Sequence, residues 1–346
     1  MTADSDTRQT TDHPETPPWP FAHVVVTGGA GFVGSHVCEE LVRRGSSVVC
    51  VDDLSTGSEE NVAHLLAEPR FTLLVSDVSR GLGDPPELFL RTDLVLHLAS
   101  PASPVDYRRR PIETLDVGAA GTRHALELSE ATGARFVLAS TSEVYGDPQV
   151  HPQPETYWGH VNPIGPRSVY DEAKRFAEAQ TSAWRRTRGV DAGIVRIFNT
   201  YGPRMRTDDG RMVPTFIRQA LGGEPLSVSG DGTQTRSVCY VGDLVEGLLA
   251  FAASGLPGPV NLGDDVELTV LQVAQDVIDV VGGPAPGIVH AELPEDDPRR
   301  RRPDVTLARR SLGWQAGTAW RDGLEETVAW YRARAGRPAD EPVVIG

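Results

Sequence analysis

Two short stretches carry side chains whose types and spacing suit acid–base chemistry. The first, Thr141-Ser142-Glu143, follows the apolar run Phe136 to Ala139. The second holds Tyr170 and Lys174, which share one face of a helical pattern that runs to about Arg188. A neighbouring ammonium favours the phenolate, so a phenol with a usual pKa of about 10 becomes a base nearer neutral pH. Such a base suits removing a hydroxyl proton while a hydride leaves the same carbon. A Tyr-x3-Lys spacing alone is common on exposed helices, so its meaning depends on the rest of the chain.

Glycines and aspartates near the N-terminus predict a dinucleotide-binding turn. A buried strand at 23–27 leads into a turn with glycines at positions 28, 31 and 34, and a helix follows from about Val33 to Arg44. This order permits a tight turn, a close approach to a pyrophosphate and close helix packing. A second strand, 48–51, ends in Asp52-Asp53, where a carboxylate can bind an adenosine ribose and repel a 2'-phosphate. The pattern favours NAD over NADP, and the alternative is an ordinary βαβ loop.

The residues expected to contact the cofactor lie in the glycine turn, at strand ends and on the Tyr170 helix. They are Gly28, Gly31, Phe32, Val33, Gly34, Asp52, Asp53, Asp77, Val78, Leu98, Ala99, Tyr170 and Lys174. Asp77 ends a strand and could meet the adenine, although a helix N-cap explains it nearly as well.

The elements that must position these residues alternate between strand and helix. Further strands are predicted at 71–77, 93–99, 136–139 and 191–199. The alternation indicates an α/β fold with a Rossmann-like, doubly wound parallel sheet, followed by a smaller, irregular C-terminal substrate lobe. We expect a disordered tail at 1–20 and an NAD-binding domain at 21–198. A mainly substrate-binding lobe follows at 199–334, with some segments returning to the first domain, and 335–346 form a loose tail.

Composition excludes several classes of function. The chain has 346 residues and a formal net charge of -15, which argues against nucleic-acid and membrane-surface partners. Three scattered cysteines, without paired zinc spacing, suit a reducing cytoplasm. No apolar run approaches the roughly 18 residues of a membrane span, and no signal-peptide pattern opens the chain. We therefore expect a cytoplasmic protein with no metal site.

Longer strings of residues resemble the extended short-chain dehydrogenase/reductase family of nucleotide-sugar enzymes, over roughly residues 22 to 333. The strings most similar to its UDP-glucuronate decarboxylases are His97 to Pro104, Ala139 to Pro148, Tyr157 to Arg167 and Arg196 to Met205. The resemblance implies bound NAD and conversion of UDP-glucuronate to UDP-xylose. One position departs from the pattern, because relatives usually carry Asn where this chain has Gly118.

The resemblance also implies roles for Thr141, Tyr170 and Lys174. Thr141 hydrogen-bonds the sugar C4 hydroxyl, Tyr170 takes its proton, and Lys174 binds the nicotinamide ribose while lowering the pKa of Tyr170. A ketone at C4 makes the C6 carboxylate a β-keto acid that loses carbon dioxide. C5 is then protonated, and the hydride returns to C4. Glu143 either positions a water that protonates C5 or acts electrostatically on the substrate carboxylate.

Ser142 and Glu143 weigh against other reactions of the family. A 4,6-dehydratase needs an acid to expel hydroxide, and its relatives carry Asp where this chain has Ser142. Epimerases lack an acid that matches Glu143. The alternatives are therefore a 4,6-dehydratase, a 4-epimerase or a catalytically inactive NAD sensor.

Side chains expected to hold the anionic substrate include several arginines, which match phosphate and carboxylate groups. The expected substrate contacts are Ser142, Tyr107, Asn199, Arg204, Arg236 and Arg301. By analogy with the family, helices near 116–132 and 168–188 are expected to form a homodimer contact.

Overall fold

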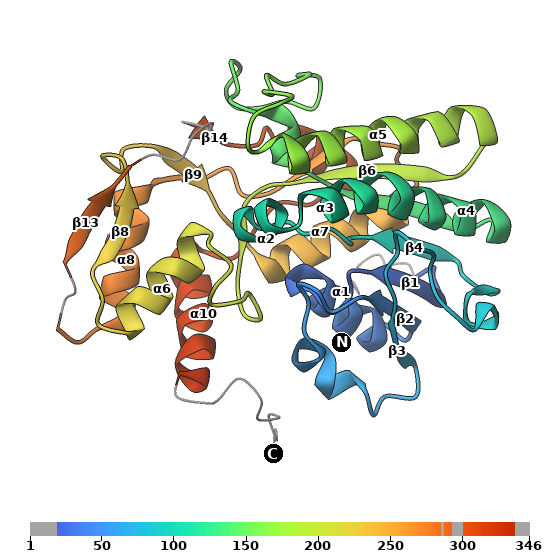
Figure 1. Ribbon diagram of the computed structural model, residues 1–346, viewed down its shortest axis with the longest axis horizontal. Helices are drawn as coiled ribbons and strands as arrows, with labels where there is room; N and C mark the ends of the chain where they lie inside the picture. The colour runs from blue at the N-terminus through green and yellow to red at the C-terminus, as the bar shows by residue number, and fades with distance from the viewer. Residues whose placement is uncertain (1–18, 285–286, 293–299, 336–346) are drawn as a thin grey trace, which may run out of the picture.

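A seven-stranded parallel sheet forms the centre of the computed structural model, which describes residues 19–284, 287–292 and 300–335 (Figure 1). The spatial order is β11-β6-β5-β4-β1-β2-β3, which confirms the doubly wound α/β class. The strands are β1 His23–Thr27, β2 Ser47–Asp52, β3 Phe71–Val75, β4 Leu94–His97, β5 Arg135–Thr141, β6 Ala192–Ile197 and β11 Val260–Leu262. Most of the two expected tails lies outside the described residues.

Strand ends differ from the sequence prediction in a way that matters for the site. Three predicted strands, 71–77, 93–99 and 191–199, stop two residues earlier than expected. The residues beyond these ends bend over the carboxyl edge of the sheet, where parallel strands present ligands. β5 runs on to Thr141, so this hydroxyl belongs to the last strand residue. β11 was not predicted, and it returns from the C-terminal half to pair with β6.

Helices cover both faces of the sheet (Figure 1). Val24 and Val26 of β1 pack in a core shared with α1 (Phe32–Arg43) and α7 (Val241–Ser254). Val25 points to the opposite face and packs in a core shared with α4 (Thr122–Thr132) and α5 (Ser168–Arg188). This alternation follows from the two-residue period of a strand. The helices of the second face are α3 Pro111–Asp116, η3 Val117–Gly121, α4 Thr122–Thr132 and α5 Ser168–Arg188.

Gly118 lies in η3, a π-helical turn that joins α3 to α4, at the closest approach to α5. A Cβ at this position would lie 2.7 Å from Cβ of Ala173, nearer than side chains pack. The absence of a side chain at 118 therefore permits the close packing of η3 on the helix that carries Tyr170 and Lys174.

A second core supports the C-terminal lobe. Its residues include Phe216, Ile217 and Val273. The helices around it are α6 Met212–Leu221, α8 Val270–Val281 and α10 Trp320–Arg334. Small sheets are formed by β7 Thr200–Tyr201 with β10 Cys239–Tyr240, by β8 Leu226–Ser229 with β13 Ile288–Ala291, and by β9 Thr235–Ser237 with β12 Glu267–Thr269 and β14 Arg300–Arg301. The remaining short helices are η1 Glu59–Leu65, η2 Pro86–Phe89, α2 Pro104–Arg109, η4 Ser142–Tyr145 and α9 Thr306–Leu312.

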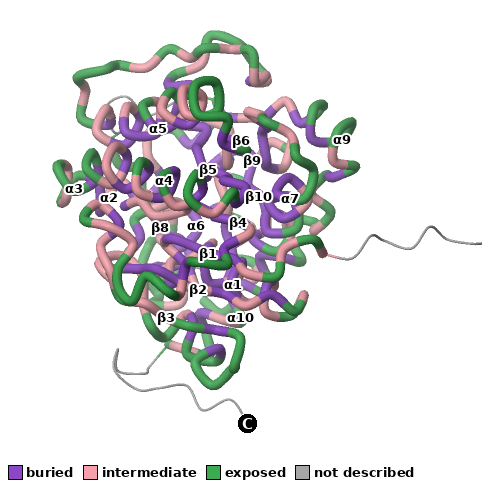
Figure 2. Tube along the Cα trace, turned by 90° about the vertical axis from the view of Figure 1, so that its right-hand side faces the viewer, coloured by how far each residue is buried: buried purple, intermediate pink, exposed green. Residues whose placement is uncertain are grey.

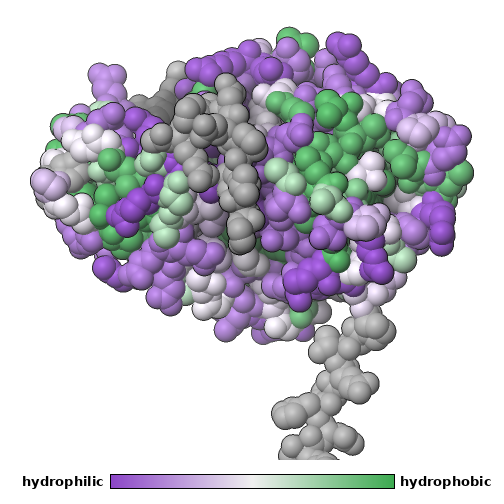
Figure 3. Space-filling view, turned by 90° about the horizontal axis from the view of Figure 1, so that it is seen from below, coloured by the Kyte–Doolittle hydropathy of each residue, from purple (hydrophilic) through white to green (hydrophobic). Residues whose placement is uncertain are grey.

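Burial is concentrated in the sheet and the helix faces that cover it, while much of the outer surface is exposed (Figure 2). The underside of the molecule is mostly hydrophilic, with an apolar area on the side of the seven-stranded sheet (Figure 3). Within the described ranges, no helix combines the length and the apolar character needed to cross a bilayer.

Candidate active site

A cavity of about 1050 Å³ lies between the carboxyl edge of the sheet and the C-terminal lobe. The loops after β1, β4, β5 and β6 line one side, and residues of α6, β8, β9 and β14 line the other. All of the cofactor, catalytic and substrate residues named from the sequence line this cavity. The structure thus brings them together, while the role of each remains a prediction.

The glycine turn forms a cradle at the N-terminus of α1. Gly28 has φ +72°, and a Cβ there would lie 2.7 Å from the backbone nitrogen of Ala99. A Cβ at Gly34 would lie 2.0 Å from the carbonyl oxygen of Gly28, so a side chain cannot be accommodated. No side chain in the described part of the chain caps α1. The cradle, open N–H groups and helix dipole fit a dinucleotide pyrophosphate.

The two aspartates after β2 differ in what they already bind. Asp52 is buried, and it accepts hydrogen bonds from Ala30 N at 3.0 Å and from Leu54 N at 2.9 Å. Burial raises the pKa of its carboxyl, although these backbone donors oppose the shift. Asp53 is exposed and accepts one bond, from Ser55 N at 2.9 Å. Asp52 therefore holds the turn in shape, and both carboxylates border the expected ribose position.

Asp77 has a local structural role as well. Its Oδ1 accepts hydrogen bonds from the backbone N–H and the hydroxyl of Ser79, at 2.9 and 2.7 Å. These bonds close a local turn, and no helix begins here, so Asp77 is not the helix N-cap that the sequence alternative proposed. The residue still lines the cavity next to Val78.

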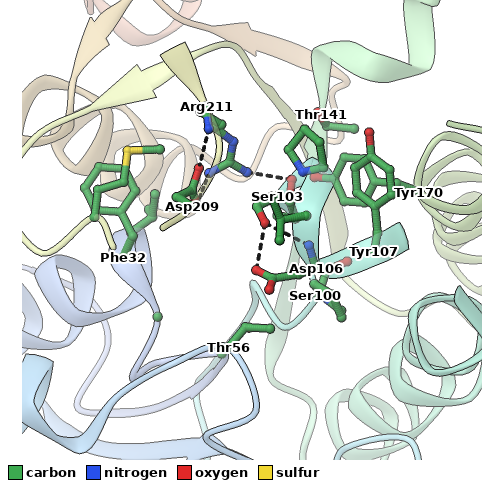
Figure 4. Close-up of a pocket in the computed structure, with 18 of the residues that line it drawn as sticks. Phe32, Thr56, Ser100, Ser103, Asp106, Tyr107, Thr141, Tyr170, Asp209 and Arg211 are labelled. Carbon is green, nitrogen blue, oxygen red and sulfur yellow. Dashed lines mark hydrogen bonds and ion pairs between the residues drawn. The ribbon is translucent and has the colours of Figure 1, made fainter. Parts of the chain in front are cut away.

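Thr141, the last residue of β5, lies near Tyr170 (Figure 4), and Lys174 lines the same cavity. Thr141 Oγ1 accepts a hydrogen bond from Glu143 N at 3.2 Å, which caps η4. Lys174 Nζ donates to the carbonyl oxygen of Ala139 at 2.9 Å and lies 6.0 Å from the centre of the Tyr170 ring. The i, i+4 spacing on α5 thus places both residues against the same strand end.

Burial dominates the pKa of Tyr170 in this structure. Burial raises the pKa of Tyr170 to about 12, although Arg211 and a hydrogen bond with Thr141 oppose the shift. Burial also lowers the pKa of Lys174 to about 8. The expectation counted the attraction between charges and omitted the cost of removing each charged form from water.

Glu143 is clamped by two arginines. Arg301 donates from Nη1 to Oε1 at 2.6 Å and from Nη2 to Oε2 at 2.8 Å, and Arg167 Nη2 donates to Oε2 at 2.8 Å. The two guanidinium groups overcome burial and lower the pKa of Glu143 to about 2. Arg301 was expected to contact the substrate, but here its two terminal nitrogens bind Glu143. The clamp keeps this carboxyl ionised at neutral pH.

Tyr107 and Ser142 also line the cavity. The Tyr107 ring stacks on the Tyr170 ring with 5.5 Å between centroids (Figure 4). Its hydroxyl is buried and has no hydrogen-bond partner among the described residues. Ser142 begins η4, is buried and lines the cavity. An unpartnered hydroxyl at a cavity wall is available to a bound sugar.

The remaining substrate candidates also line the cavity. Arg236 of β9 is buried and donates to the carbonyl oxygen of Thr235 at 2.8 Å. Asn199 follows β6. Arg204 forms an ion pair with Glu39 of α1, and this bond ties the loop after β7 to the cofactor half. A structural role therefore accompanies the predicted role of Arg204.

Sequence reasoning missed a clasp that joins three walls of the cavity. Arg206 Nη2 lies 3.0 Å from both carboxylate oxygens of Asp106, and Arg206 Nη1 donates to the Thr56 carbonyl oxygen at 3.2 Å. Arg211 Nη2 donates to the carbonyl oxygen of Ala102 at 2.6 Å (Figure 4). Because the partners are distant in sequence, no local pattern could identify these bonds.

Sequence comparison finds relatives along most of the chain. The model of the NAD dependent epimerase/dehydratase family matches residues 24–263. UDP-glucuronic acid decarboxylase 1 of Arabidopsis thaliana is 48% identical over 311 residues, which cover 90% of this chain and 70% of that protein. UDP-glucuronic acid decarboxylase 1 of Xenopus tropicalis is 47% identical, over 89% of this chain and 72% of that protein.

Solved structures share the fold. A UDP-glucose 4-epimerase from Thermotoga maritima, with UDP-glucose bound, has a TM-score of 0.81 and 29% identity, over 90% of this chain and 99% of that one. A dTDP-glucose 4,6-dehydratase from Streptomyces venezuelae, with NAD bound, has a TM-score of 0.80 and 27% identity, over 91% and 98%.

Proposed function

Because this chain belongs to the NAD dependent epimerase/dehydratase family, we propose that it is an NAD-dependent UDP-glucuronate decarboxylase that forms UDP-xylose and carbon dioxide. The observation that carries this proposal is the turn after β5. It presents the Thr141 hydroxyl and the Glu143 carboxylate beside Tyr170, and it has a serine rather than an acid at position 142. This is the set of groups that an oxidation at C4 followed by decarboxylation requires.

The cofactor site fits NAD in shape and charge. The glycine cradle and the open N-terminus of α1 would hold the pyrophosphate, and Asp52 and Asp53 would border the adenosine ribose. Bound NAD would supply the acceptor for a hydride from C4 of the sugar and would later supply the same hydride for the return step. Recycling within each turnover means that no net reduction of the cofactor is expected.

Tyr170 acts on the C4 hydroxyl in this proposal. Thr141, which hydrogen-bonds Tyr170, orients that hydroxyl, and Tyr170 removes its proton as the ketone forms. Lys174 is buried beside Tyr170 and supplies positive charge that favours the phenolate as the proton is transferred. The C4 ketone then accepts the electrons that carbon dioxide leaves behind, and Tyr170 returns its proton when C4 is reduced.

Three arginines that line the cavity support a substrate with a carboxylate and a diphosphate. Arg236 of β9 is paired with Arg301 of β14, and Arg301 and Arg167 both bind Glu143. A uronate carboxylate that approaches Glu143 meets two guanidinium groups, whereas a neutral hydroxymethyl group would gain no ion pair.

The rival reactions of the family are disfavoured by the same turn. A dehydratase needs a proton donor for the departing C6 hydroxyl, and the Ser142 hydroxyl is too weak an acid. The two solved neighbours carry out such other reactions by their names, but both are under 30% identical to this chain. The decarboxylases are 47% and 48% identical.

The reaction can be tested with purified protein, NAD and UDP-glucuronate, following released carbon dioxide and the sugar by NMR. We expect UDP-xylose with almost no net change in NADH absorbance. Conversion of UDP-glucose or dTDP-glucose to a 4-keto-6-deoxy sugar, with UDP-glucuronate untouched, would instead identify a dehydratase.

A homodimer forms part of the proposal. Apolar side chains are exposed on the two helices near the expected contact, at Ile112 and Leu115 of α3 and at Phe176 of α5. Burying such residues against a second copy is favourable. Light scattering should give twice the monomer mass, and Phe176→Glu should shift the population toward monomer. The free, buried cysteines Cys38, Cys50 and Cys239 support residence in a reducing cytoplasm.

A further inference from the structure

The proposed reaction consumes one proton in every turnover. Carbon dioxide leaves from a carboxylate, and C5 gains a hydrogen in its place. Tyr170 takes a proton from the C4 hydroxyl and gives it back when C4 is reduced, so its contribution cancels. The proton for C5 must therefore come from another group of the site or from water.

Glu143 is close to the reaction but does not store this proton. Arg301 and Arg167 hold it with three hydrogen bonds of 2.6 to 2.8 Å, and they lower its pKa to about 2. At neutral pH the carboxyl is therefore ionised. It can pass a proton on during the reaction, but a neighbour must provide it.

Asp171, one residue after Tyr170 on α5, is a buried carboxyl with no other assigned role. Only 6% of its surface is exposed. Its Oδ1 is fully buried and accepts no hydrogen bond within the described part of the chain. An ionised oxygen without a donor is costly in such a place, so the environment favours the neutral acid.

The charged groups around Asp171 come from three segments. Glu143 of η4 and Glu172 of α5 carry negative charge within electrostatic reach of Asp171. Arg167, before α5, and Arg301 of β14 carry positive charge within the same reach. Burial and the charge of Glu143 raise the pKa of Asp171 to about 7, although the two arginines oppose this. The tyrosines Tyr107 and Tyr170 also lie within its electrostatic reach.

The charge at the site changes during the reaction in the direction that favours release of the Asp171 proton. With UDP-glucuronate bound, its carboxylate and Glu143 already match the two arginines, so Asp171 retains its proton. When carbon dioxide has left, the negative charge lies on the enolate at C4 and C5. Proton transfer then neutralises the sugar, and Asp171 becomes the second anion beside the arginines.

We propose that Asp171 is the positioning acid of this site, which stores the proton for C5 and delivers it through Glu143. The Asp171 O–H bond breaks as Glu143 is protonated, Glu143 passes its proton to C5 of the enolate, and solvent reprotonates Asp171. The inference rests on the proposed decarboxylase function, and it names a residue that does not line the cavity itself.

Asp171→Asn tests this step, because the amide keeps the shape of the neutral acid but cannot release a proton. We expect one turnover of C4 oxidation and carbon dioxide release, followed by a stall with NADH bound. The NADH band should rise to roughly one equivalent per site, and kcat should fall at least about a hundredfold, as is typical when a general acid is lost. Glu172→Gln, on the neighbouring partly exposed acid, is the matched control and should behave as the wild type.

The pH profile distinguishes proton supply from packing. Wild-type kcat should fall above about pH 7 as Asp171 loses its proton, and Asp171→Asn should lack this alkaline limb. Asp171→Glu retains an acid and should recover part of the activity. If Asp171→Asn keeps kcat within twofold of the wild type, or loses the carbon dioxide and NADH bursts together, the proposal is wrong. A wild type that releases no carbon dioxide from UDP-glucuronate would refute the function instead.

Discussion

The aromatic ring of Tyr107 lies parallel to the ring of Tyr170, with 7° between their planes. Tyr107 belongs to α2 and Tyr170 to α5, so the stack joins two helices at the reacting end of the cavity. It covers one face of the proposed base and leaves the unpartnered Tyr107 hydroxyl at the cavity wall.

Two substitutions at Tyr107 should separate the effect of its hydroxyl from the effect of its stacked ring. Tyr107→Phe keeps the stack and loses the hydroxyl, so KM for UDP-glucuronate should rise roughly tenfold, the value of one hydrogen bond of about 1.4 kcal/mol. Tyr107→Ala also removes the stack and should lower kcat, because Tyr170 loses its support. Steady-state kinetics of both variants measure KM and kcat separately. If each variant changes KM and kcat by the same factor, the two effects are not separable as proposed.

Removing the hydroxyl of Tyr170 should stop the chemistry without unfolding the site. Tyr170→Phe retains the ring that packs against Tyr107, so NAD affinity and melting temperature should stay near wild type. C4 oxidation should fall by at least about a hundredfold. Tyr157→Phe is the control, since the Tyr157 hydroxyl accepts a bond from Gln149 N instead. Near-normal turnover of Tyr170→Phe would contradict the assignment of the base.

The carboxyls of Glu143 and Asp171 should affect the free energy of unfolding in opposite ways as the pH changes. The pKa of Glu143 is lowered to about 2 in the folded state, so its stabilisation is present above pH 4.5 and is lost as pH falls toward 2. The pKa of Asp171 is raised from 3.8 to about 7, so the folded state binds the extra proton and stability falls as pH rises between these values. Melting temperatures from pH 4 to 8 should decline less steeply for Asp171→Asn than for the wild type. Parallel curves would contradict the shifted pKa.

Cofactor choice should follow the carboxylates after β2. NAD should bind at least about tenfold more tightly than NADP, a difference of about 1.4 kcal/mol, because Asp52 and Asp53 repel a 2'-phosphate. Asp53→Asn should reduce the difference between the NAD and NADP affinities while leaving the turn intact, since among the described residues the Asp53 side chain accepts a bond from Ser55 N alone. Asp52→Asn should also weaken NAD, because Ala30 and Leu54 lose their acceptor. Calorimetry measures both affinities, and equal binding of the two cofactors by the wild type would be the contrary result.

The Asp106–Arg206 clasp should slow the loss of NAD between turnovers. Arg206→Gln breaks the ion pair across the cavity, so NAD should dissociate roughly tenfold faster, as for the loss of about 1.4 kcal/mol. Arg218→Gln, which breaks an exposed pair with Glu224, provides the control. Stopped-flow displacement of bound NAD measures the rates. If the rate of NAD release from Arg206→Gln is unchanged, the ion pair supports only the loop that carries Arg206.

The sequence predicted the parts of the site that depend on local order. The glycine turn, Asp52 at the end of β2, Thr141 at the end of β5 and the Tyr170–Lys174 spacing each lie within one strand–turn–helix unit. In such a unit, chain geometry fixes which residues reach the carboxyl edge of the sheet. The doubly wound fold followed from the alternation of these units, and it was confirmed.

Only the tertiary structure decided which distant charges meet and what burial does to them. Arg301 was one of four neighbouring arginines in the sequence, and it was the parallel pairing of β14 with β9 that placed it 2.6 Å from Glu143. The three residues of β11 are too few to form a recognisable strand pattern in the sequence, and their pairing with β6 identifies them as a strand. The pKa values of Tyr170 and Asp171 are raised chiefly because surrounding segments bury these side chains away from water. Desolvation depends on the whole fold, whereas the order of residues along one strand or helix does not reveal it.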